Sequence, residues 1–437
     1  MESWKRNLYI MWVAEFIAII GFGVILPFLP YFIQELGVTD EAQVKLYAGL
    51  ALALSPLTMA LVSPVWGVLA DRFGRKVMVE RAMFGGAILF FANGFVENVH
   101  VFLILRALQG CFSGTIAAAN TLVAGSAPRE HAGYAQGTLL VSVYLGMLLG
   151  PTIGGVVGDL WGYRAAFFVT SALLALAGIL VFWVEEHFAP MARERAPGGF
   201  QRDLRLILGM APLVTIFGLR VISLLGDRIL TPLLPLLVHQ LLPSGAKAAF
   251  TTGVILGASG LTSAIGAIVL GRASDRFGAR SVLLFCSFAS VGLYTFQFFV
   301  TDTTQLLLGQ ALVGFVLGGT LTALSAMLAK LSPEGRQGVV YGIDASAIAI
   351  AKFLGPLMGA GVAIGFGLPP GFLVCGGLLC ADGSPGRAIL AGTSRASGNS
   401  RAARANERTC SRWIEMMRMP RPGLPTLPSL AHHTRVG

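Results

Sequence analysis

The sequence is poor in charged residues, which make up only 12% of its 437 positions. Soluble domains hold about 25% charged and about 45–50% apolar residues, whereas this chain is 55% apolar with a mean hydropathy of +0.73. Apolar stretches of about 20 residues recur along it, and each is long enough to cross a ~30 Å hydrocarbon core as a helix. The composition therefore excludes a soluble globular protein and predicts an all-α membrane protein.

Residues that carry metal, redox or nucleotide chemistry are also scarce. The five cysteines show no metal or redox spacing, and Cys286, Cys375 and Cys380 lie in apolar segments, where cysteine behaves as a small hydrophobe. The six histidines form no ligand cluster, and the adjacent pair His432 and His433 lies in the tail. The sequence contains no nucleotide-binding P-loop. We therefore expect no enzyme activity, no cofactor, no metal and no direct drive by ATP.

The net charge of +10 does not indicate nucleic-acid binding, because the basic residues lie between apolar spans and form no face of a soluble domain. The start MESWKRNLYIMWVAEF has the basic beginning and apolar run of a signal peptide. However, the run contains Glu15, continues past Pro27 and Pro30, and lacks a small-residue cleavage site. We interpret it as the first membrane-spanning helix.

Hydropathy predicts eleven spanning helices. They cover roughly residues 8–34, 45–70, 78–96, 101–124, 133–158, 164–184, 207–240, 249–271, 281–300, 304–329 and 338–366. The polar segment 185–206, which contains Pro and Gly, is the one obvious linker and separates a half at 1–184 from a half at 207–381.

Basic residues indicate the orientation of these spans. The N-terminus and every second connection carry most of the Lys and Arg residues, whereas the opposite connections carry only Lys45, Arg164 and Lys247. By the positive-inside rule, the N-terminus and the linker at 185–206 are expected in the cytoplasm. We expect a bacterial-type inner membrane.

An internal repeat divides the chain. GVLADRFGRKVMV at position 67 returns as GRASDRFGARSVL at 271 (271 − 67 = 204), and RALQG at 106 returns as QALVG at 310. LGPTIGG at 149 returns as LGPLMGA at 354 (354 − 149 = 205), and LPFLP at 26 returns as TPLLP at 231. Four matches in one order predict two homologous six-helix halves related by a pseudo-twofold axis, with a substrate site between them near the middle of the membrane.

These stretches resemble the major facilitator superfamily. GVLADRFGRK resembles the signature loop of the superfamily, and LPFLP, RALQG and GMLLGPTIGG (146–155) resemble elements of its drug:proton antiporter branch with twelve helices. The resemblance covers roughly residues 5–380. It implies the major facilitator fold and a monomer in the lipid bilayer. It also implies multidrug efflux, the proton-coupled export of lipophilic and often cationic compounds by alternating access, with a role in antibiotic resistance.

The resemblance implies a gating role for the signature loop. Asp71 and Arg75 are expected to form a charge network that holds one state, while Gly74 permits a tight turn. An ion pair between two rigid bodies can shift their populations strongly. The alternative is a plain positive-inside anchor. The gating residues and their repeats are Gly67, Asp71, Arg72, Gly74, Arg75, Asp275, Arg276 and Gly278.

The fifth-helix stretch and the paired prolines are the other motifs of the antiporter branch. Glycines recur there every four residues and so line one helix face, where another helix can approach closely. Pro151 removes a backbone hydrogen bond and is expected to kink the helix. The resemblance implies a seam that closes one side against leak, and the alternative is ordinary packing. The residues are Gly146, Gly150, Pro151, Gly154 and Gly155, with Pro27 and Pro30 in the first helix.

Ionisable residues inside the spans are the remaining candidates, because such groups are costly in a membrane. Glu15 lies about 10 Å into the first helix, where a carboxylate can exchange protons near neutral pH and attract a cation. The alternative is a solvated carboxylate near the interface. Its repeat partner is Arg220 (15 + 205 = 220), and we expect the two to pair in one state only. The other proton-coupling or substrate candidates are Arg106, Asp227, Asp344 and Lys352, with Arg228 beside Asp227.

The end of the sequence departs from the family pattern. The partner of helix six should begin near Pro369, but apolar character stops at Asp382, too soon to span. Residues 382–437 hold nine Arg, no Lys and many Gly, Pro and Ser, which predicts disorder. Either a frameshift near Ala381 has truncated the twelfth helix, or the Arg-rich tail is real. Two other functions therefore stay open: export of a specific metabolite or sugar, and a non-functional truncated product.

Overall fold

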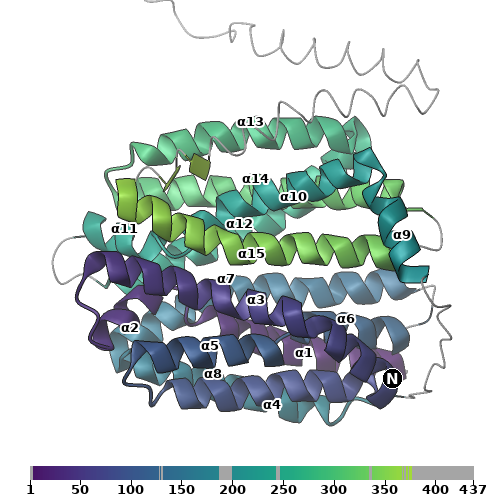
Figure 1. Cartoon of the computed structure of the whole chain (residues 1–437), viewed down its shortest axis with the longest axis horizontal. Helices are drawn as coiled ribbons and strands as arrows, with labels where there is room; N and C mark the ends of the chain where they lie inside the picture. Colours follow the sequence, from purple (N-terminus) through teal and green to yellow (C-terminus); the bar gives the residue numbers. More distant parts are fainter. Residues whose placement is uncertain are drawn as a thin grey trace, which may run out of the picture. The chain divides into compact units, whose positions relative to one another are not determined.

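The computed structural model describes residues 3–126, 128, 131–186, 199–242, 247–333, 337–366, 368, 371–372 and 374–375. The chain divides into two units, residues 1–386 and 387–437, and all described residues belong to the first. The predicted tail at 382–437, most of the predicted twelfth helix and residues 187–198 of the predicted linker lie outside this description. Every regular element within it is a helix, which confirms the all-α prediction (Figure 1).

Fifteen helices build the described part of the chain. The first half contains α1 (Ser3–Gly23), α2 (Leu29–Glu35), α3 (Glu41–Phe73), α4 (Arg75–Asn93), α5 (Val99–Phe112), α6 (Thr115–Ser126), α7 (Ala132–Trp161) and α8 (Tyr163–Val181). The second half contains α10 (Ala211–Leu230), α11 (Leu234–Leu241), α12 (Ala248–Phe277), α13 (Ala279–Phe298), α14 (Thr303–Leu331) and α15 (Gln337–Phe366), and α9 (Gly199–Leu208) precedes it.

All eleven predicted spans are present as helices or as pairs of shorter helices. Within the described residues, nine are long and apolar enough to cross a membrane. The two that fall short are α4, whose first two turns contain Arg75, Lys76, Glu80 and Arg81, and the α5–α6 pair, which is split into two short helices. The chain is therefore a multi-pass membrane protein by its helices.

Proline interrupts two of the spans that the sequence predicted as continuous. The first span ends at Gly23 and resumes as α2, because Pro27 and Pro30 lack an N–H and restrict the residues before them. The seventh span breaks in the same way around Pro232, between α10 and α11. Predicting unbroken helices at 8–34 and 207–240 was wrong, although the prolines responsible were visible.

Glycine interrupts a third span. The predicted helix at 101–124 ends as α5 at Phe112 and restarts as α6 at Thr115. Gly114, between them, has a φ of +115°, in the left-handed region that glycine adopts readily. The prediction of one continuous helix was wrong here too, because a Ser-Gly step in an apolar run is also compatible with a helix.

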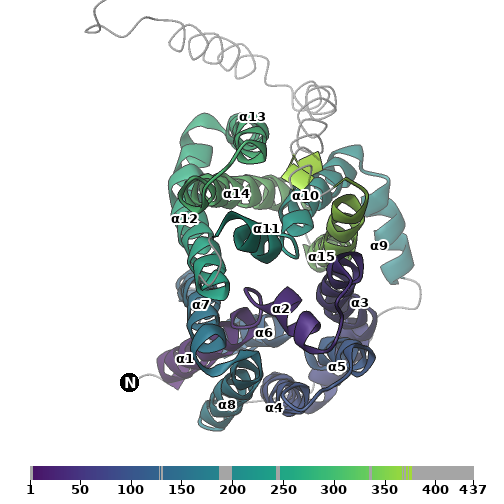
Figure 2. The same cartoon turned by 90° about the vertical axis from the view of Figure 1, so that its left-hand side faces the viewer.

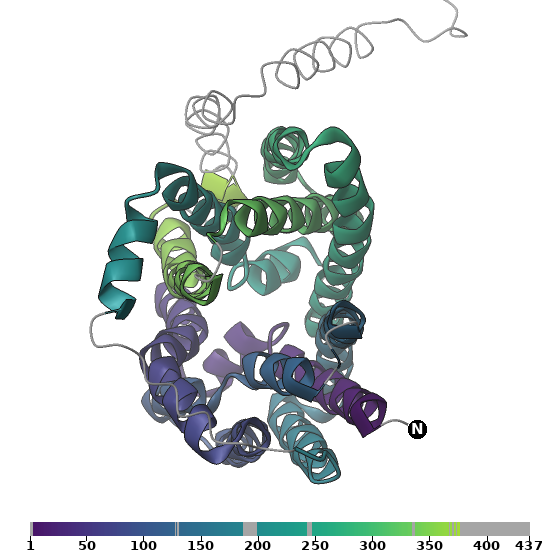
Figure 3. The ribbon, with the colours of Figure 1, turned by 90° about the vertical axis from the view of Figure 1, so that its right-hand side faces the viewer.

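The two halves share one internal arrangement. Helix α7 packs between α1 of its own half and α12 of the other, and α15 packs in the same way between α10 and α3. Figure 2 shows these neighbours as the pairs α7–α12 and α3–α15 on opposite sides. Figure 3 shows the arrangement from the other end, with the first half in purple to blue and the second in teal to green. The packing agrees with the two halves predicted from the repeat.

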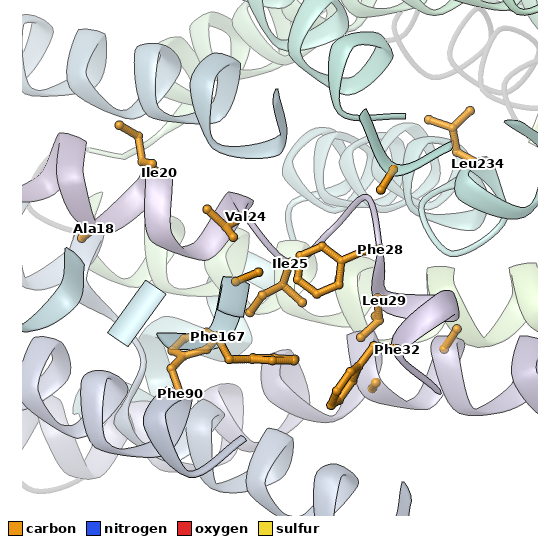
Figure 4. Close-up of a cluster of buried hydrophobic side chains, with 14 of the residues drawn as sticks. Ala18, Ile20, Val24, Ile25, Phe28, Leu29, Phe32, Phe90, Phe167 and Leu234 are labelled. Carbon is orange, nitrogen blue, oxygen red and sulfur yellow. The ribbon is translucent and has the colours of Figure 1, made fainter. Parts of the chain in front are cut away.

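A buried aromatic cluster surrounds the break between α1 and α2 (Figure 4). The rings of Phe28 and Phe32 lie 5.9 and 4.7 Å from the ring of Phe167 in α8, between centroids. Phe28 also stacks on Tyr163 at 5.3 Å. Edge-to-face and stacked pairs of this kind add to the free energy gained by burial alone. The cluster therefore stabilises a stretch of chain that is not helical.

The helix α9 lies largely within the segment that we predicted as a linker, 185–206. Its residue Ile207 is fully buried and packs in one cluster with Leu213 and Ile216 of α10. The sequence did not indicate this helix because the segment is polar. The linker is therefore shorter than predicted.

Candidate functional site

The turn between α3 and α4 contains the signature loop. Gly74 ends α3 with a φ of +97°, so the predicted tight turn is present, and Gly278 takes a φ of +88° at the repeated position. The Glu186 carboxylate accepts hydrogen bonds from the backbone N–H groups of Arg75 and Lys76, each at 2.9 Å. These are first-turn N–H groups of α4, which have no partner within the helix. Glu186 thus caps α4, a role that the sequence analysis missed.

The charged side chains of the loop are only partly described. The side chain of Asp71 lies outside the description, so the network of Asp71 and Arg75 stays a prediction. The guanidinium of Arg72 is exposed and lies over the ring of Phe73 at 5.4 Å. The repeated side chains of Asp275 and Arg276 are exposed at the end of α12.

Arg81 joins three helices near this turn. Its guanidinium lies 3.6 Å from the ring centroid of Trp66 in α3, and its Nη2 donates to the carbonyl of Ser113 at 3.3 Å. Trp66 in turn donates from Nε1 to the carbonyl of Cys111 at 2.7 Å. Arg81 therefore links α3, α4 and the end of α5, a role that the sequence did not predict.

The glycines of the 146–155 stretch lie where helix backbones come closest. A Cβ added to Gly150 would lie 2.7 Å from the carbonyl oxygen of Ile20 in α1, which is too close for a side chain. One added to Gly155 would lie 2.5 Å from the carbonyl oxygen of Ala249 in α12. Pro151 lies inside α7, which continues through it. Close packing is therefore confirmed, and the role as a seal stays a prediction.

The remaining glycines of the motif also face α1. A Cβ added to Gly146 would meet the Cβ of Ile19 at 2.7 Å, and one added to Gly154 would overlap the carbonyl of Val24. In the second half, Gly359 of α15 approaches the carbonyl of Ile229 in α10 in the same way. The repeat therefore preserves a contact between helix backbones.

Glu15 is fully buried in α1. Its Oε1 accepts a hydrogen bond from the hydroxyl of Thr115 at 3.2 Å, and its Oε2 has no hydrogen-bond partner among the described residues. Thr115 is the first residue of α6, just after the break in the fourth span. A buried carboxylate with one free oxygen is costly unless it binds a proton or a cation. This burial excludes the alternative of a solvated carboxylate at the interface.

Arg106 is buried in α5 with a neutral partner. Its Nη1 donates to Oε1 of Gln109 at 3.1 Å, and its backbone carbonyl accepts from the hydroxyl of Ser55 at 2.6 Å. Nε of Arg106 and Nε2 of Gln109 have no partner among the described residues. In the described part of the chain, Arg106 therefore forms no ion pair with a neighbouring acid that would explain it as a structural residue.

In this structure Arg220 is paired with Asp344 rather than with Glu15. Its Nε lies 2.9 Å from Oδ1 of Asp344 in α15, and its Nη2 donates to the hydroxyl of Ser325 at 2.8 Å. Both members of the ion pair are buried. Pairing of Arg220 with Glu15 stays a prediction for another conformation.

The last three candidates lie on α10 and α15. Arg228 and Asp227, which are adjacent in the sequence, form an ion pair between Nε and Oδ2 at 3.3 Å. Lys352 lies near the middle of α15, and its side chain is exposed. No carboxylate of the described residues lies within ion-pair distance of its ammonium.

Several polar contacts between the halves lie at one end of the helices, which we call the Tyr31 end. The hydroxyl of Tyr31 in α2 donates to the carbonyl of Pro235 in α11, and Figure 2 shows these two short helices together between the longer ones. The carboxylate of Asp159 accepts from the backbone N–H of Phe250 at 2.8 Å. Lys45 in α3 donates to a carbonyl of α15 at 3.5 Å. These contacts hold α2, α3 and α7 of the first half against α11, α12 and α15 of the second.

Comparison with known proteins decides the family. The family model of the Major Facilitator Superfamily matches residues 11–219 and again residues 216–427. The chain belongs to the major facilitator superfamily. This membership confirms the resemblance and the two-part organisation, and it indicates a membrane transporter rather than an enzyme.

Curated relatives and solved structures agree with this membership. The chain is 34% identical to multidrug resistance protein MdtG of Salmonella paratyphi A over 383 residues, which are 86% of this chain and 93% of that protein. It is 34% identical to MdtG of Proteus mirabilis over 367 residues, 84% and 91% of the two chains.

Two similar folds are a point mutant of the nucleoside transporter NupG and a bacterial homologue of the human lysosomal transporter Spinster in an inward-facing, unoccupied conformation. Each has a TM-score of 0.73. The sequence identities are 14% and 15%, and the alignments cover 88% and 89% of this chain and 99% and 97% of the other. At these identities the likeness supports the fold alone.

Proposed function

We propose that this transporter exports lipophilic compounds in exchange for protons, by alternating access. The relatives named multidrug resistance protein support drugs as the substrate class. The observation that supports proton coupling most directly is the burial of Glu15, which has one carboxylate oxygen free and the other bound by Thr115. A single buried carboxylate can hold either a proton or a cationic group, so the two compete for it.

Arg106 supports a second step of this exchange. Its guanidinium is buried, donates a hydrogen bond to the Gln109 amide and lies 5.8 Å from the ring centroid of Phe102. A fixed cation near the path of a proton favours release of that proton from an acid. We assign to Arg106 a role in proton release. We assign to the ion pair of Arg220 and Asp344 a role in setting the conformation of the second half.

We propose that the described conformation is closed toward the outside of an inner membrane. Basic residues favour a cytoplasmic N-terminus, which puts the Tyr31 end on the outer side. The contact of Tyr31 with Pro235 and the contact of Asp159 with Phe250 lie on that side and join the two halves. In this reading, export requires these contacts to open while the end that holds Gly74 closes.

The test is a pH gradient in everted membrane vesicles that contain the full chain. Lipophilic compounds are added one at a time while a fluorescent weak base reports the gradient. We expect wild type to dissipate the gradient and Glu15→Gln to abolish this response. Glu97→Gln is the matched control, because Glu97 is exposed in a connection. An equal loss in both variants, or a full response in Glu15→Gln, would contradict the proposed coupling.

Two outcomes would favour the other functions. If a chain with a restored twelfth helix dissipates the gradient and the present chain does not, the present chain is a truncated and inactive exporter. If neither responds to lipophilic compounds, export of a specific metabolite or sugar is favoured.

A further inference from the structure

We propose that Lys352 and Arg228 form a recognition site for an acidic group of the substrate. The inference rests on the proposed export function and names a substrate class for it: lipophilic compounds that carry a carboxylate, sulfonate or phosphonate. It assigns to the second half a role that the carboxylate of Glu15 cannot perform, because that carboxylate attracts only cations.

Lys352 lies on the side of α15 that faces away from lipid. Ile350 and Leu354, two residues before and after it, are 49% and 38% exposed and apolar. A helix turns about 100° per residue, so both point about 200° away from Lys352. An apolar exposed face on a membrane helix is the face that contacts lipid. The ammonium is therefore directed toward the protein interior while remaining accessible.

The neighbouring residues place Lys352 between α10 and α3. Gly355, one turn further along, meets Arg228 of α10, and a Cβ added to Gly49 of α3 would lie 2.8 Å from the carbonyl oxygen of Pro356. Arg228 therefore lies beside the turn of α15 that contains Lys352. Two cations from different helices thus lie close together beside the boundary between the halves.

The charges around this point do not balance. In the described part of the second half, three cations lie here, Arg220, Arg228 and Lys352, with two carboxylates. Both carboxylates are already in ion pairs: Asp344 with Arg220 at 2.9 Å and Asp227 with Arg228 at 3.3 Å. Lys352 therefore lacks a counter-ion among the described residues. A positive charge without a partner at membrane depth is costly. An acidic ligand would supply the missing charge through charge-assisted hydrogen bonds.

The experiment compares two ligands that share a fluorophore and differ in charge. Dansylglycine carries a carboxylate and dansylcadaverine carries an ammonium, and fluorescence anisotropy measures binding of each to the purified full chain. We expect Lys352→Gln to weaken the binding of dansylglycine about tenfold or more, because hydrogen bonds to charged groups are stronger than those between neutral groups. The affinity for dansylcadaverine should change less than twofold in the same variant. This retained binding also shows that the variant is folded.

Two further variants complete the design. Lys352→Arg keeps the charge and should keep most of the affinity for dansylglycine. Lys330→Gln removes an exposed lysine at the end of α14 and should change neither affinity. The inference is overturned if wild type does not bind dansylglycine, or if Lys352→Gln weakens both ligands equally.

Transport of the two dyes in everted vesicles separates this inference from the proposed function. If dansylglycine binds through Lys352 but neither dye nor any other lipophilic compound is exported, the proposed function fails and the recognition site stands. If dansylcadaverine is exported and dansylglycine is neither bound nor exported, export stands and the recognition site fails.

Discussion

At the residue scale, Glu15 and Thr115 meet because the fourth span breaks. The break at Gly114 makes Thr115 the first residue of α6, and its hydroxyl reaches the Glu15 carboxylate at 3.2 Å. The first N–H groups of a helix have no partner within it and give that end a partial positive charge. These groups offset part of the cost of a negative Glu15, and a proton that neutralises it weakens the link between α1 and α6.

Replacing Thr115 tests this link. Thr115→Val keeps the shape and removes the hydroxyl, so the Glu15 carboxylate loses its one described side-chain partner. A hydrogen bond to a charged group contributes about 1.5–3 kcal/mol, so we expect substrate-induced dissipation of the pH gradient to slow about tenfold. Rates in everted vesicles measure this. Thr115→Ser retains the donor and should stay within about twofold of wild type; a similar loss in both variants would contradict the assignment.

At the element scale, sequence patterns predicted which helices pack closely better than they predicted where a span is interrupted. The stripe of glycines in α7 predicted an approaching helix, and both α1 and α12 approach it. The breaks at Pro27 and Pro232 follow from missing N–H groups and were missed because apolar character continues across them. Glu186, the cap of α4, could not be predicted, because only tertiary packing brings it within 2.9 Å of Arg75.

Two glycines of α7 form a matched pair for testing the packing. A Cβ at Gly154 would overlap the carbonyl of Val24, whereas a Cβ at Gly137 would meet nothing within 4 Å. We expect Gly154→Ala to destabilise the protein by about 1–3 kcal/mol, since overpacking displaces the neighbouring backbone. Gly137→Ala should be nearly neutral. Thermal unfolding in detergent measures both, and equal midpoints for the two variants would show that α1 and α7 can separate freely.

At the scale of the whole molecule, the two repeated halves pack against each other along α7–α12 and α3–α15, and polar contacts join them at the Tyr31 end. The offset of 204–205 residues and the motifs predicted the halves and the family. Which end is closed could not be predicted, because the contact of Tyr31 with Pro235 joins residues 204 positions apart. Such contacts set the balance between two rigid-body states, and small changes in free energy shift it.

Tyr31→Phe removes one of these contacts and should favour opening of the Tyr31 end. A hydrogen bond contributes about 0.5–1.5 kcal/mol, so the ratio of open to closed molecules should rise about two- to tenfold. Spin labels at Glu41 and Lys247, which are exposed near that end in different halves, report the separation by electron paramagnetic resonance. An unchanged distance distribution would mean that the Tyr31 contact does not hold the two halves together.

The most direct test of the account is drug accumulation by the purified full chain in liposomes, driven only by an imposed proton gradient that is acid inside. The account predicts that wild type accumulates a lipophilic dye against its gradient, that a protonophore abolishes this, and that Glu15→Gln does not accumulate the dye while Glu97→Gln does. Dye accumulation that does not depend on the proton gradient, or that persists in Glu15→Gln, would contradict proton-coupled export through this carboxylate.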